Sequence, residues 1–275
     1  MSKTFAGFSL DRPLIMGIVN ATPDSFSDGG EAYQFEDAVA RGLALIDEGA
    51  DIIDVGGEST RPGAEPVSLE EELRRTVPVV QRLSEAGACV SIDTRHALVM
   101  EEALAAGAEI INDVTALTGD ARSLDVASNC DAPIILMHMQ GEPGTMQATP
   151  TYEDAAKEVC AYLKARVHAC EAAGIARDRI ALDPGIGFGK TVEHNIEILK
   201  HLSLYDALGL PVLLGVSRKS FIGKIAEQPD AKLRLPGSIA AALAGVMRGA
   251  KILRVHDVAE TKQALDIWRA IEGAN

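Results

Sequence analysis

Polar and charged side chains follow a series of short apolar segments in this sequence. Each segment has the character of a buried strand, and the group at its end can hydrogen-bond or carry charge. These groups are Asn20, Glu58, Thr60, Arg61, Asp93, Asn112, Asp113, His138, Asp183, Ser217, Arg218, Lys219, Ser220, Arg254 and His256. A single one could merely cap a strand or begin a helix. A whole series that converges on one opening would form a binding site for a polar ligand.

The strands that would position these groups are predicted from runs of apolar, often β-branched residues. They span 14–19, 51–55, 89–93, 110–113, 134–137, 180–183, 212–216 and 251–255. Their nearly continuous apolar character is typical of parallel strands that are buried on both faces. Helices are predicted at 36–48, 69–85, 97–105, 152–173, 192–201, 236–247 and 259–271. Several of them end at a glycine suited to the left-handed position that closes a helix, as at Gly49, Gly87, Gly107 and Gly174.

This alternation predicts an α/β fold, the (β/α)8 TIM barrel, whose active site forms at the C-terminal ends of the strands. A doubly wound open sheet is the structural alternative. It would be favoured by a G-x-G-x-x-G motif after the first strand, and residues 17–22 (GIVNAT) do not supply one. No linker or change of composition divides the chain, so residues 1–275 are predicted to form a single domain.

Composition excludes several classes of protein. The 275 residues carry 26 Lys and Arg against 40 Asp and Glu, a formal net charge of −14. That balance argues against nucleic acid or an anionic membrane as a partner, although a few local cations could still bind an anionic substrate. The N-terminal segment lacks the apolar core of a signal peptide, and no apolar stretch reaches the length of a membrane span. The four cysteines include no C-x-x-C pair, and two of them, Cys160 and Cys170, fall on the apolar stripe of a predicted helix. We therefore predict a cytoplasmic protein.

Two patterns suggest functions that the spacing does not support. The segment 185–191 (GIGFGKT) ends like a P-loop, but Pro184 stands where the first glycine is required. It is better interpreted as a turn after a strand, where glycines let the backbone approach a ligand. His194 and His201 share a helix face without the spacing or third ligand of a zinc site.

The chain closely resembles the dihydropteroate synthase family. The resemblance rests on eight blocks that follow the family's order along nearly the whole chain. They are MGIVNATPDSFSDGG (16–30), DVGGESTRPG (54–63), SIDT (91–94), INDV (111–114), MHMQG (137–141), DPGIGFGK (183–190), GVSRKS (215–220) and RVH (254–256). The resemblance implies a (β/α)8 enzyme of folate biosynthesis, in a family that sulfonamides target. It would join 6-hydroxymethyl-7,8-dihydropterin diphosphate to 4-aminobenzoate, releasing diphosphate and 7,8-dihydropteroate.

The resemblance also assigns the pterin-binding residues. Asp183 would accept hydrogen bonds from the exocyclic amine and ring N–H of the pterin, with Asp93 and Asn112 completing that edge. Lys219 would donate to the pterin carbonyl and ring nitrogen, and Met137 would pack on the ring. Buried polar groups left unpaired by a wrong ligand give strong discrimination, so this edge would supply specificity. The family places the catalytic roles on Lys219, Asp93 and Asp183.

For the diphosphate, the family supplies Arg254 and His256 after the last strand. Asn20 would hold Mg²⁺ through its carbonyl oxygen, with the other ligands coming from diphosphate and water. Thr60, Arg61 and Asp24 would act from the first two loops. The resemblance therefore implies Mg²⁺ as the cofactor and two small molecules, the pterin diphosphate and 4-aminobenzoate, as the substrates.

The arylamine would lie at the outer part of the same site. The family places Ser220, at the start of a helix, near the carboxylate of 4-aminobenzoate, with Pro62, Phe188 and Lys219 lining its ring. It also suggests a homodimer through the last helices, around 240–246 and 259–268.

Two other functions stay open. A methyltetrahydrofolate–corrinoid type of pterin methyltransferase would keep the pterin-edge acids, but it does not need the RVH segment, the SRKS segment or the STRP loop. A non-catalytic pterin-binding paralogue is the other alternative.

Overall fold

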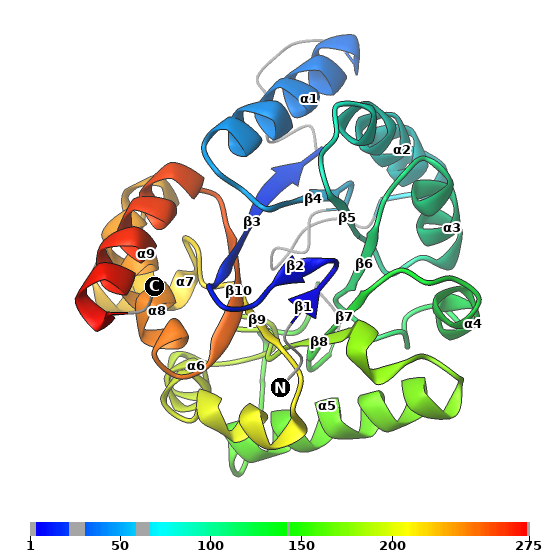
Figure 1. Cartoon of the computed structure of the whole chain (residues 1–275). Coiled ribbons are helices and arrows are strands. Elements are labelled where there is room, and N and C mark those ends of the chain that lie inside the picture. The colour runs from blue at the N-terminus through cyan, green and yellow to red at the C-terminus, as the bar shows by residue number, and fades with distance from the viewer. Residues whose placement is uncertain (1–3, 22–30, 59–66, 142–143, 274–275) are drawn as a thin grey trace.

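The computed structural model describes residues 4–21, 31–58, 67–141 and 144–273. Within them, eight parallel strands close into a barrel in the order β10-β3-β4-β5-β6-β7-β8-β9. Helices surround the barrel (Figure 1). The predicted (β/α)8 barrel is confirmed, and the open-sheet alternative is wrong.

The barrel strands are β3 (Leu14–Asn20), β4 (Ile52–Gly56), β5 (Val90–Asp93), β6 (Ile110–Asp113), β7 (Ile134–Met137), β8 (Ile180–Asp183), β9 (Val212–Leu214) and β10 (Ala250–Val255). The α-helices are α1 (Glu31–Asp47), α2 (Leu69–Glu85), α3 (Ala97–Ala105), α4 (Ser123–Ser128), α5 (Ala155–Ala172), α6 (Val192–Lys200), α7 (Ser220–Ile225), α8 (Leu235–Val246) and α9 (Val258–Glu272). Short 3₁₀ helices lie at η2 (Arg177–Arg179), η3 (Leu202–Leu208) and η4 (Ala231–Leu233). The glycines predicted to close helices, Gly49, Gly87, Gly107 and Gly174, all have positive φ.

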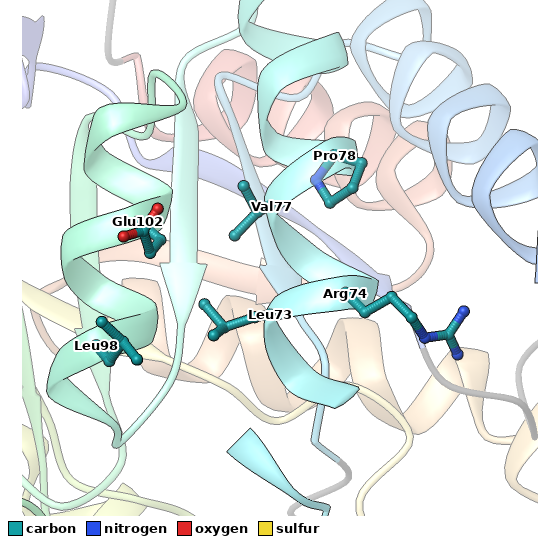
Figure 2. Close-up of a pocket in the computed structure, with 6 residues that line it drawn as sticks. All are labelled: Leu73, Arg74, Val77, Pro78, Leu98 and Glu102. Carbon is teal, nitrogen blue, oxygen red and sulfur yellow. The ribbon is translucent and has the colours of Figure 1, made fainter. Parts of the chain in front are cut away.

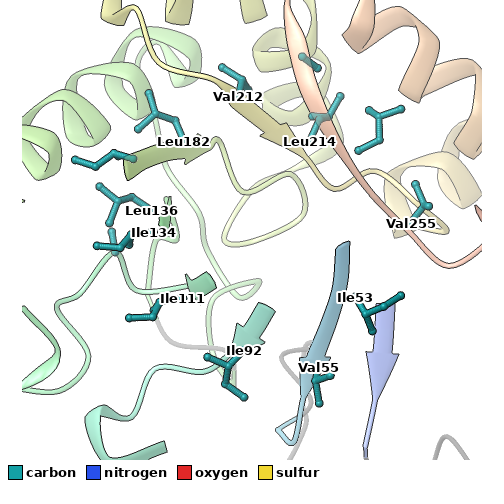
Figure 3. Packing of buried hydrophobic residues seen from close by; sticks show 14 of the residues in the cluster. Ile53, Val55, Ile92, Ile111, Ile134, Leu136, Leu182, Val212, Leu214 and Val255 are labelled. Atoms are coloured by element: carbon teal, nitrogen blue, oxygen red, sulfur yellow. The ribbon is translucent and has the colours of Figure 1, made fainter. Parts of the chain in front are cut away.

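The strands separate two apolar regions because successive side chains point to opposite faces. Outward side chains such as Ile53, Ile92 and Leu182 pack under the helices (Figure 3). Inward side chains form a smaller apolar layer in the lower barrel: Leu14, Met16, Ile52, Ile110, Ile135, Ala181, Leu213 and Ile252. Phe5 and Leu10, from the N-terminal segment, pack into the same cluster.

A hairpin that the sequence analysis did not predict lies at the N-terminal end of the barrel. It pairs β1 (Thr4–Phe5) with β2 (Phe8–Ser9) in antiparallel fashion. The turn holds two residues at positive φ, Ala6 and Gly7. Strands of two residues are too short to show an alternating pattern, which is why periodicity gave no signal.

One helix begins later than predicted because a capping side chain fixes its first residue. The helix predicted from residue 152 begins at Ala155, because the Asp154 side chain accepts a hydrogen bond from the Lys157 amide. Cys170 is buried on this helix as predicted, whereas Cys160 is only half-buried at the edge of the stripe. Within the described residues, none of the helices is both long and apolar enough to span a membrane.

Candidate active site

A charged cluster lies just above the lower apolar layer, at the C-terminal end of the barrel. Arg254 donates from Nε to Asp54 Oδ2 at 2.6 Å and from Nη2 to Asp93 Oδ2 at 2.6 Å. Asn112 Nδ2 donates to the same Asp54 carboxylate at 3.1 and 3.3 Å. Strand alternation explains the placement, since Asp54, Asn112 and Arg254 each follow an inward-facing isoleucine of the layer below by two residues.

Asp183 occupies the corresponding position on β8, two residues beyond Ala181. Its Oδ1 accepts a hydrogen bond from the Gly185 amide at 2.7 Å, and its backbone carbonyl accepts one from the His138 amide at 3.0 Å. Asp183 is thereby held by its own turn and by the neighbouring strand end. Its second carboxylate oxygen is available to a ligand.

Burial sets the protonation of the two site carboxylates. It raises the pKa of Asp93 to about 7, while the neighbouring Arg254 guanidinium acts in the opposite direction. Burial also raises the pKa of Asp183. The hydrogen bond from the Gly185 amide and the nearby cations Lys219, Arg254 and Lys190 act in the opposite direction and lower it. The site is therefore a carboxylate-rich pocket that depends on nearby positive charge to remain ionised.

An apolar wall stands beside these acids. Met137 and Phe188 pack with Val114 and Met146 in one buried cluster. The ammonium of Lys219 lies over the Phe188 ring, 4.1 Å from its centroid, in cation–π geometry. The turn after β8 and the loop after β9 thus bring an aromatic ring and a cation together at the opening.

The other predicted site residues that the structure describes lie around the opening. Ser217 Oγ is 3.0 Å from His256 Nδ1 and accepts a hydrogen bond from the His256 amide at 3.2 Å. Asn20 is half-buried at the end of β3, in register with Gly56. Ser220 is exposed at the first residue of α7. Thr60, Arg61, Pro62 and Asp24 lie outside the described residues.

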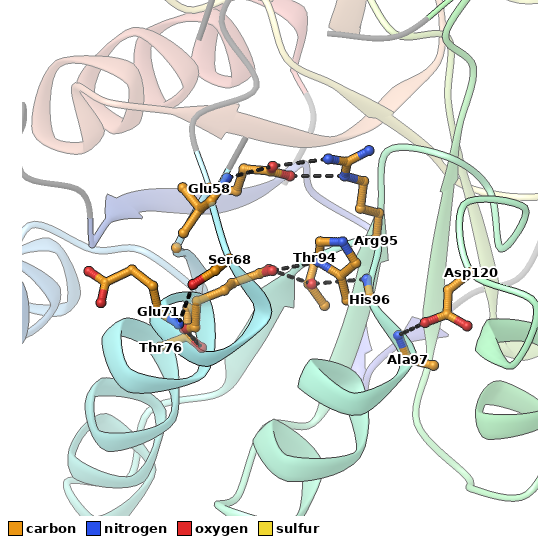
Figure 4. A network of polar contacts seen from close by, with 12 residues as sticks. Glu58, Ser68, Glu71, Thr76, Thr94, Arg95, His96, Ala97 and Asp120 are labelled. Carbon is orange, nitrogen blue, oxygen red and sulfur yellow. Dashed lines mark hydrogen bonds and ion pairs between the residues drawn. The ribbon is translucent and has the colours of Figure 1, made fainter. Parts of the chain in front are cut away.

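A polar network supports the Asp93 side of the opening (Figure 4). The Arg95 guanidinium forms two hydrogen bonds with Glu58, at 2.9 and 3.0 Å. The buried Glu72 carboxylate of α2 accepts from Thr94 Oγ1 and contacts His96 Nδ1, both at 2.6 Å. The segment that follows Asp93 is therefore tied to α2 and to the end of β4.

The chain also matches the sequence model of a known protein family. Residues 16–256 match the model described as pterin binding enzyme. The chain belongs to that family. Its matched segment begins at the third residue of β3 and ends at the residue after β10, so it includes seven barrel strands in full and most of β3.

Similar members of the pterin binding enzyme family include dihydropteroate synthases from several bacteria. The one from Neisseria meningitidis serogroup C is 54% identical over 265 residues, covering 95% of this chain and 94% of the relative. The one from Escherichia coli strain K12 is 47% identical over 272 residues, covering 98% and 96%. A solved structure of the Xanthomonas albilineans enzyme with 4-aminobenzoic acid superposes with a TM-score of 0.91 at 49% identity, covering 96% of this chain and 95% of that one. The same enzyme in complex with 7,8-dihydropteroate gives a TM-score of 0.89 at 46% identity, with the same coverage.

Sequence reasoning overlooked site residues of this pterin binding enzyme that are buried. Asp54 was noted only as the start of a motif, yet it is fully buried and holds Arg254 and Asn112. Alternation from Ile52 could have placed it inside the barrel. His138, already named among the strand-end groups, is also buried, and it contacts the buried Lys190 at 3.0 Å. No sequence pattern relates these two residues, because the contact depends on how two turns pack.

A hollow of about 380 Å³ lies away from these groups, between α2 and α3 (Figure 2). Its lining is Leu73, Arg74, Val77, Pro78, Leu98 and Glu102. None of the polar side chains at the strand ends lines it, so the substrate site is placed at the barrel opening.

Proposed function

We propose that this enzyme condenses 6-hydroxymethyl-7,8-dihydropterin diphosphate with 4-aminobenzoate, giving 7,8-dihydropteroate and diphosphate. The observation that carries the proposal is the inward layer of Asp54, Asp93, Asn112, Asp183 and Arg254. It offers acceptors for an aminopyrimidinone edge beside a cation for an anionic leaving group. The relatives at 47–54% identity, which are named for this synthase, support the same reaction.

The pterin would bind deepest, on the apolar layer of the lower barrel. Asp183 accepts from its exocyclic amine and ring N–H, and Asp93 and Asn112 complete the edge. Lys219 donates to the pterin carbonyl, and Met137 packs on the ring. Each of these residues comes from a different strand or strand-end loop, so the rigid barrel positions the whole set.

The diphosphate would lie toward β10. Arg254 uses Nε and Nη2 for Asp54 and Asp93, which leaves Nη1 as a donor for an anion without breaking the ion pairs. His256, oriented by Ser217, adds a donor. Asn20 fits Mg²⁺ as a single amide oxygen at the rim, since Mg²⁺ commonly binds few protein groups and takes its other ligands from phosphate and water. The bound ion would neutralise charge on the leaving diphosphate.

The chemical step follows from this placement. The bond between the pterin methyl carbon and the diphosphate oxygen breaks, and the electron pair leaves with the diphosphate. The pterin ring delocalises the positive charge, and the carboxylates of Asp93 and Asp183 stabilise it. The amine nitrogen of 4-aminobenzoate bonds to the pterin methyl carbon and releases one proton, which the departing diphosphate or solvent accepts. Because this amine is already nucleophilic, its in-line orientation matters more than a strong base.

4-Aminobenzoate would bind at the outer part of the opening. Phe188, Lys219 and Pro62 line its ring, and Ser220 lies near its carboxylate. Thr60, Arg61 and Asp24 would contribute from the two loops that follow β3 and β4. The ring of Phe188, with Lys219 above it, supplies the described part of this wall.

The assembly proposed for the enzyme is a homodimer in the cytoplasm. The large apolar side chains Met247, Ile267 and Ile271 are 64%, 60% and 76% exposed at the ends of α8 and on α9. Such a surface suits an interface between copies. All four cysteines are free, which is consistent with a reducing compartment. Light scattering at micromolar concentration tests the dimer.

The deciding experiment is a coupling assay with the pterin diphosphate, 4-aminobenzoate and Mg²⁺. The proposal expects dihydropteroate and diphosphate in equal amounts, and neither product when one substrate is omitted. Methyl transfer from methyltetrahydrofolate to a corrinoid would favour the methyltransferase alternative. Pterin binding without turnover would favour the paralogue.

The roles of Arg254 and Mg²⁺ have a separate test by equilibrium binding. Arg254→Ala should weaken the pterin diphosphate by about tenfold or more, and the bare hydroxymethyl pterin much less. In the unaltered enzyme, chelation of Mg²⁺ should likewise weaken binding of the pterin diphosphate more than binding of the bare hydroxymethyl pterin. The matched control is Arg248→Ala, at an exposed arginine after α8. Equal weakening of both ligands would make Arg254 a structural residue.

A further inference from the structure

Lys190 is a buried cation to which the proposed mechanism gives no role. It follows the glycine-rich turn after β8 and is only 3% exposed. Its Nζ donates to the Phe188 carbonyl at 2.9 Å and to the His138 carbonyl at 3.3 Å, and lies 3.0 Å from His138 Nδ1. An ammonium has three protons, so these contacts satisfy it fully. None of them is to a carboxylate.

The three contacts of Lys190 connect the turn after β8 to the segment after β7, where these two stretches of backbone lie very close together. A Cβ on Gly185 would lie 1.9 Å from the His138 carbonyl oxygen, and one on Gly189 would lie 2.3 Å from the Gln140 carbonyl oxygen. Tyr152 also donates to the Gly189 carbonyl, at 2.9 Å. The turn after β8 is thus pressed against the segment after β7, and Lys190 joins the two.

This junction determines where Phe188 stands. The residue lies inside the turn, and its carbonyl is the acceptor at 2.9 Å from Lys190. Its ring supports the Lys219 ammonium at 4.1 Å. A change at Lys190 therefore reaches Lys219 through one aromatic ring.

Titratable groups surround Lys190 from several elements. His138 comes from the end of β7, Asp183 from β8 and Lys219 from the loop after β9; Tyr152, Tyr162 and His194 lie beyond His138. Burial lowers the pKa of Lys190 to about 7, and the Asp183 carboxylate opposes that shift. Burial also lowers the pKa of His138 to about 3, so its imidazole stays neutral beside the ammonium.

We propose that Lys190 is a positioning residue for the arylamine side of the site, because it holds the turn that places Phe188 beneath Lys219. The inference rests on the proposed function. It assigns to the lysine of the glycine-rich turn a role in binding 4-aminobenzoate rather than the pterin.

Steady-state kinetics of Lys190→Met test the proposal, each KM being measured with the other substrate saturating. We expect the KM for 4-aminobenzoate to rise about tenfold, and the KM for the pterin diphosphate to rise clearly less, because Lys219 serves both ligands whereas Phe188 serves only the arylamine. Lys200→Met, at an exposed lysine that ends α6, is the matched control and should change neither.

The outcomes separate the two levels of inference. If the unaltered enzyme forms no dihydropteroate, the proposed function fails before any variant is compared. If it is active and Lys190→Met raises both KM values equally, or neither, the positioning role is overturned. Should Lys190→Met not fold, Lys190→Gln, which keeps two donors for the two carbonyls, replaces it; a smaller rise confined to 4-aminobenzoate supports the role, and a parallel rise refutes it.

Discussion

Arg254 illustrates how one residue serves both the fold and the site. Its guanidinium is clamped by Asp54, which is fully buried, and by Asp93, whose side chain is 11% exposed. A buried ion pair is a poor source of net stability because desolvation offsets most of the attraction. We interpret the two ion pairs as a means of orienting Arg254, because the two carboxylates fix the plane of its guanidinium before any anion binds. The Arg254 side chain is only 20% exposed, because its ion pair with Asp54 holds it inside the barrel.

Asp183 gives a direct test of the pterin edge. Asp183→Asn should reduce pterin affinity by one to two orders of magnitude, since a charge-assisted hydrogen bond contributes about 1.5–3 kcal/mol. The fold should persist, because the amide retains an oxygen that can accept from Gly185. Calorimetry with a hydroxymethyl pterin measures the effect. Unchanged affinity in a folded variant would remove Asp183 from the pterin site.

Asp93 should make pterin binding depend on pH. Burial raises its pKa to about 7, so the ionised acceptor is lost as pH falls through that value. Pterin affinity should therefore strengthen from pH 5.5 to 7.5, by up to about tenfold per unit at the acidic end. Asp93→Asn should bind more weakly, with a shallower profile that Asp183 alone sets, since burial also raises the pKa of Asp183. A flat profile in the unaltered enzyme would contradict the role of Asp93 as the titrating acceptor.

At the scale of elements, much of the barrel could be predicted from the sequence. Apolar strand runs and helical stretches closed by a glycine carry their own signal. The strands at 110–113, 134–137 and 180–183 and the helices at 69–85 and 97–105, which Gly87 and Gly107 follow at positive φ, therefore have the predicted bounds. Periodicity does not predict the six-residue helices α4 and α7, because less than two turns shows no period. The start of α7 at Ser220 agrees with the helix start that the family resemblance implies.

The candidate site was predictable only in part, for a related physical reason. Residues at strand ends, such as Asp183 and Arg254, follow from the barrel topology once the strands are known. Lys190 and His138 meet because two turns pack together, and no spacing within either segment encodes that contact. Asp54 falls between these cases, since period-2 alternation predicts its direction but not its partners.

Close packing of the two turns gives the element-scale prediction. Gly185→Ala should sharply reduce activity and lower the midpoint of thermal unfolding, because the new methyl would meet the His138 carbonyl at 1.9 Å. Gly209→Ala is the matched control: its φ of 67° is nearly equal to the 66° of Gly185, and nothing lies within 4 Å of the added atom. Gly209→Ala therefore measures the effect of backbone strain alone, which should lower the free energy of unfolding by about 1–2 kcal/mol. Equal effects of the two substitutions would mean that the approach of the turns is not essential.

At the scale of the molecule, the N-terminal hairpin completes the interior. Phe5 is 1% exposed and packs against the inward layer of the lower barrel. Phe5→Ala should lower the free energy of unfolding by about 3–5 kcal/mol, the usual cost of removing a buried phenyl ring. Denaturant titration measures this loss. Phe8→Ala, at a half-buried neighbour, should cost clearly less, and a similar cost would show that the hairpin does not seal the barrel.

The sealed lower barrel has a consequence for the order of events during turnover. With Phe5, Leu10 and the inward layer below, a ligand in the barrel can enter and depart only at the C-terminal end. In the proposed function the pterin moiety binds deepest, so the pterin diphosphate would have to arrive before 4-aminobenzoate, and dihydropteroate would leave as one molecule after diphosphate. Dihydropteroate should then block the next pterin until it has departed in full, so accumulated product slows the enzyme in direct competition with its pterin substrate.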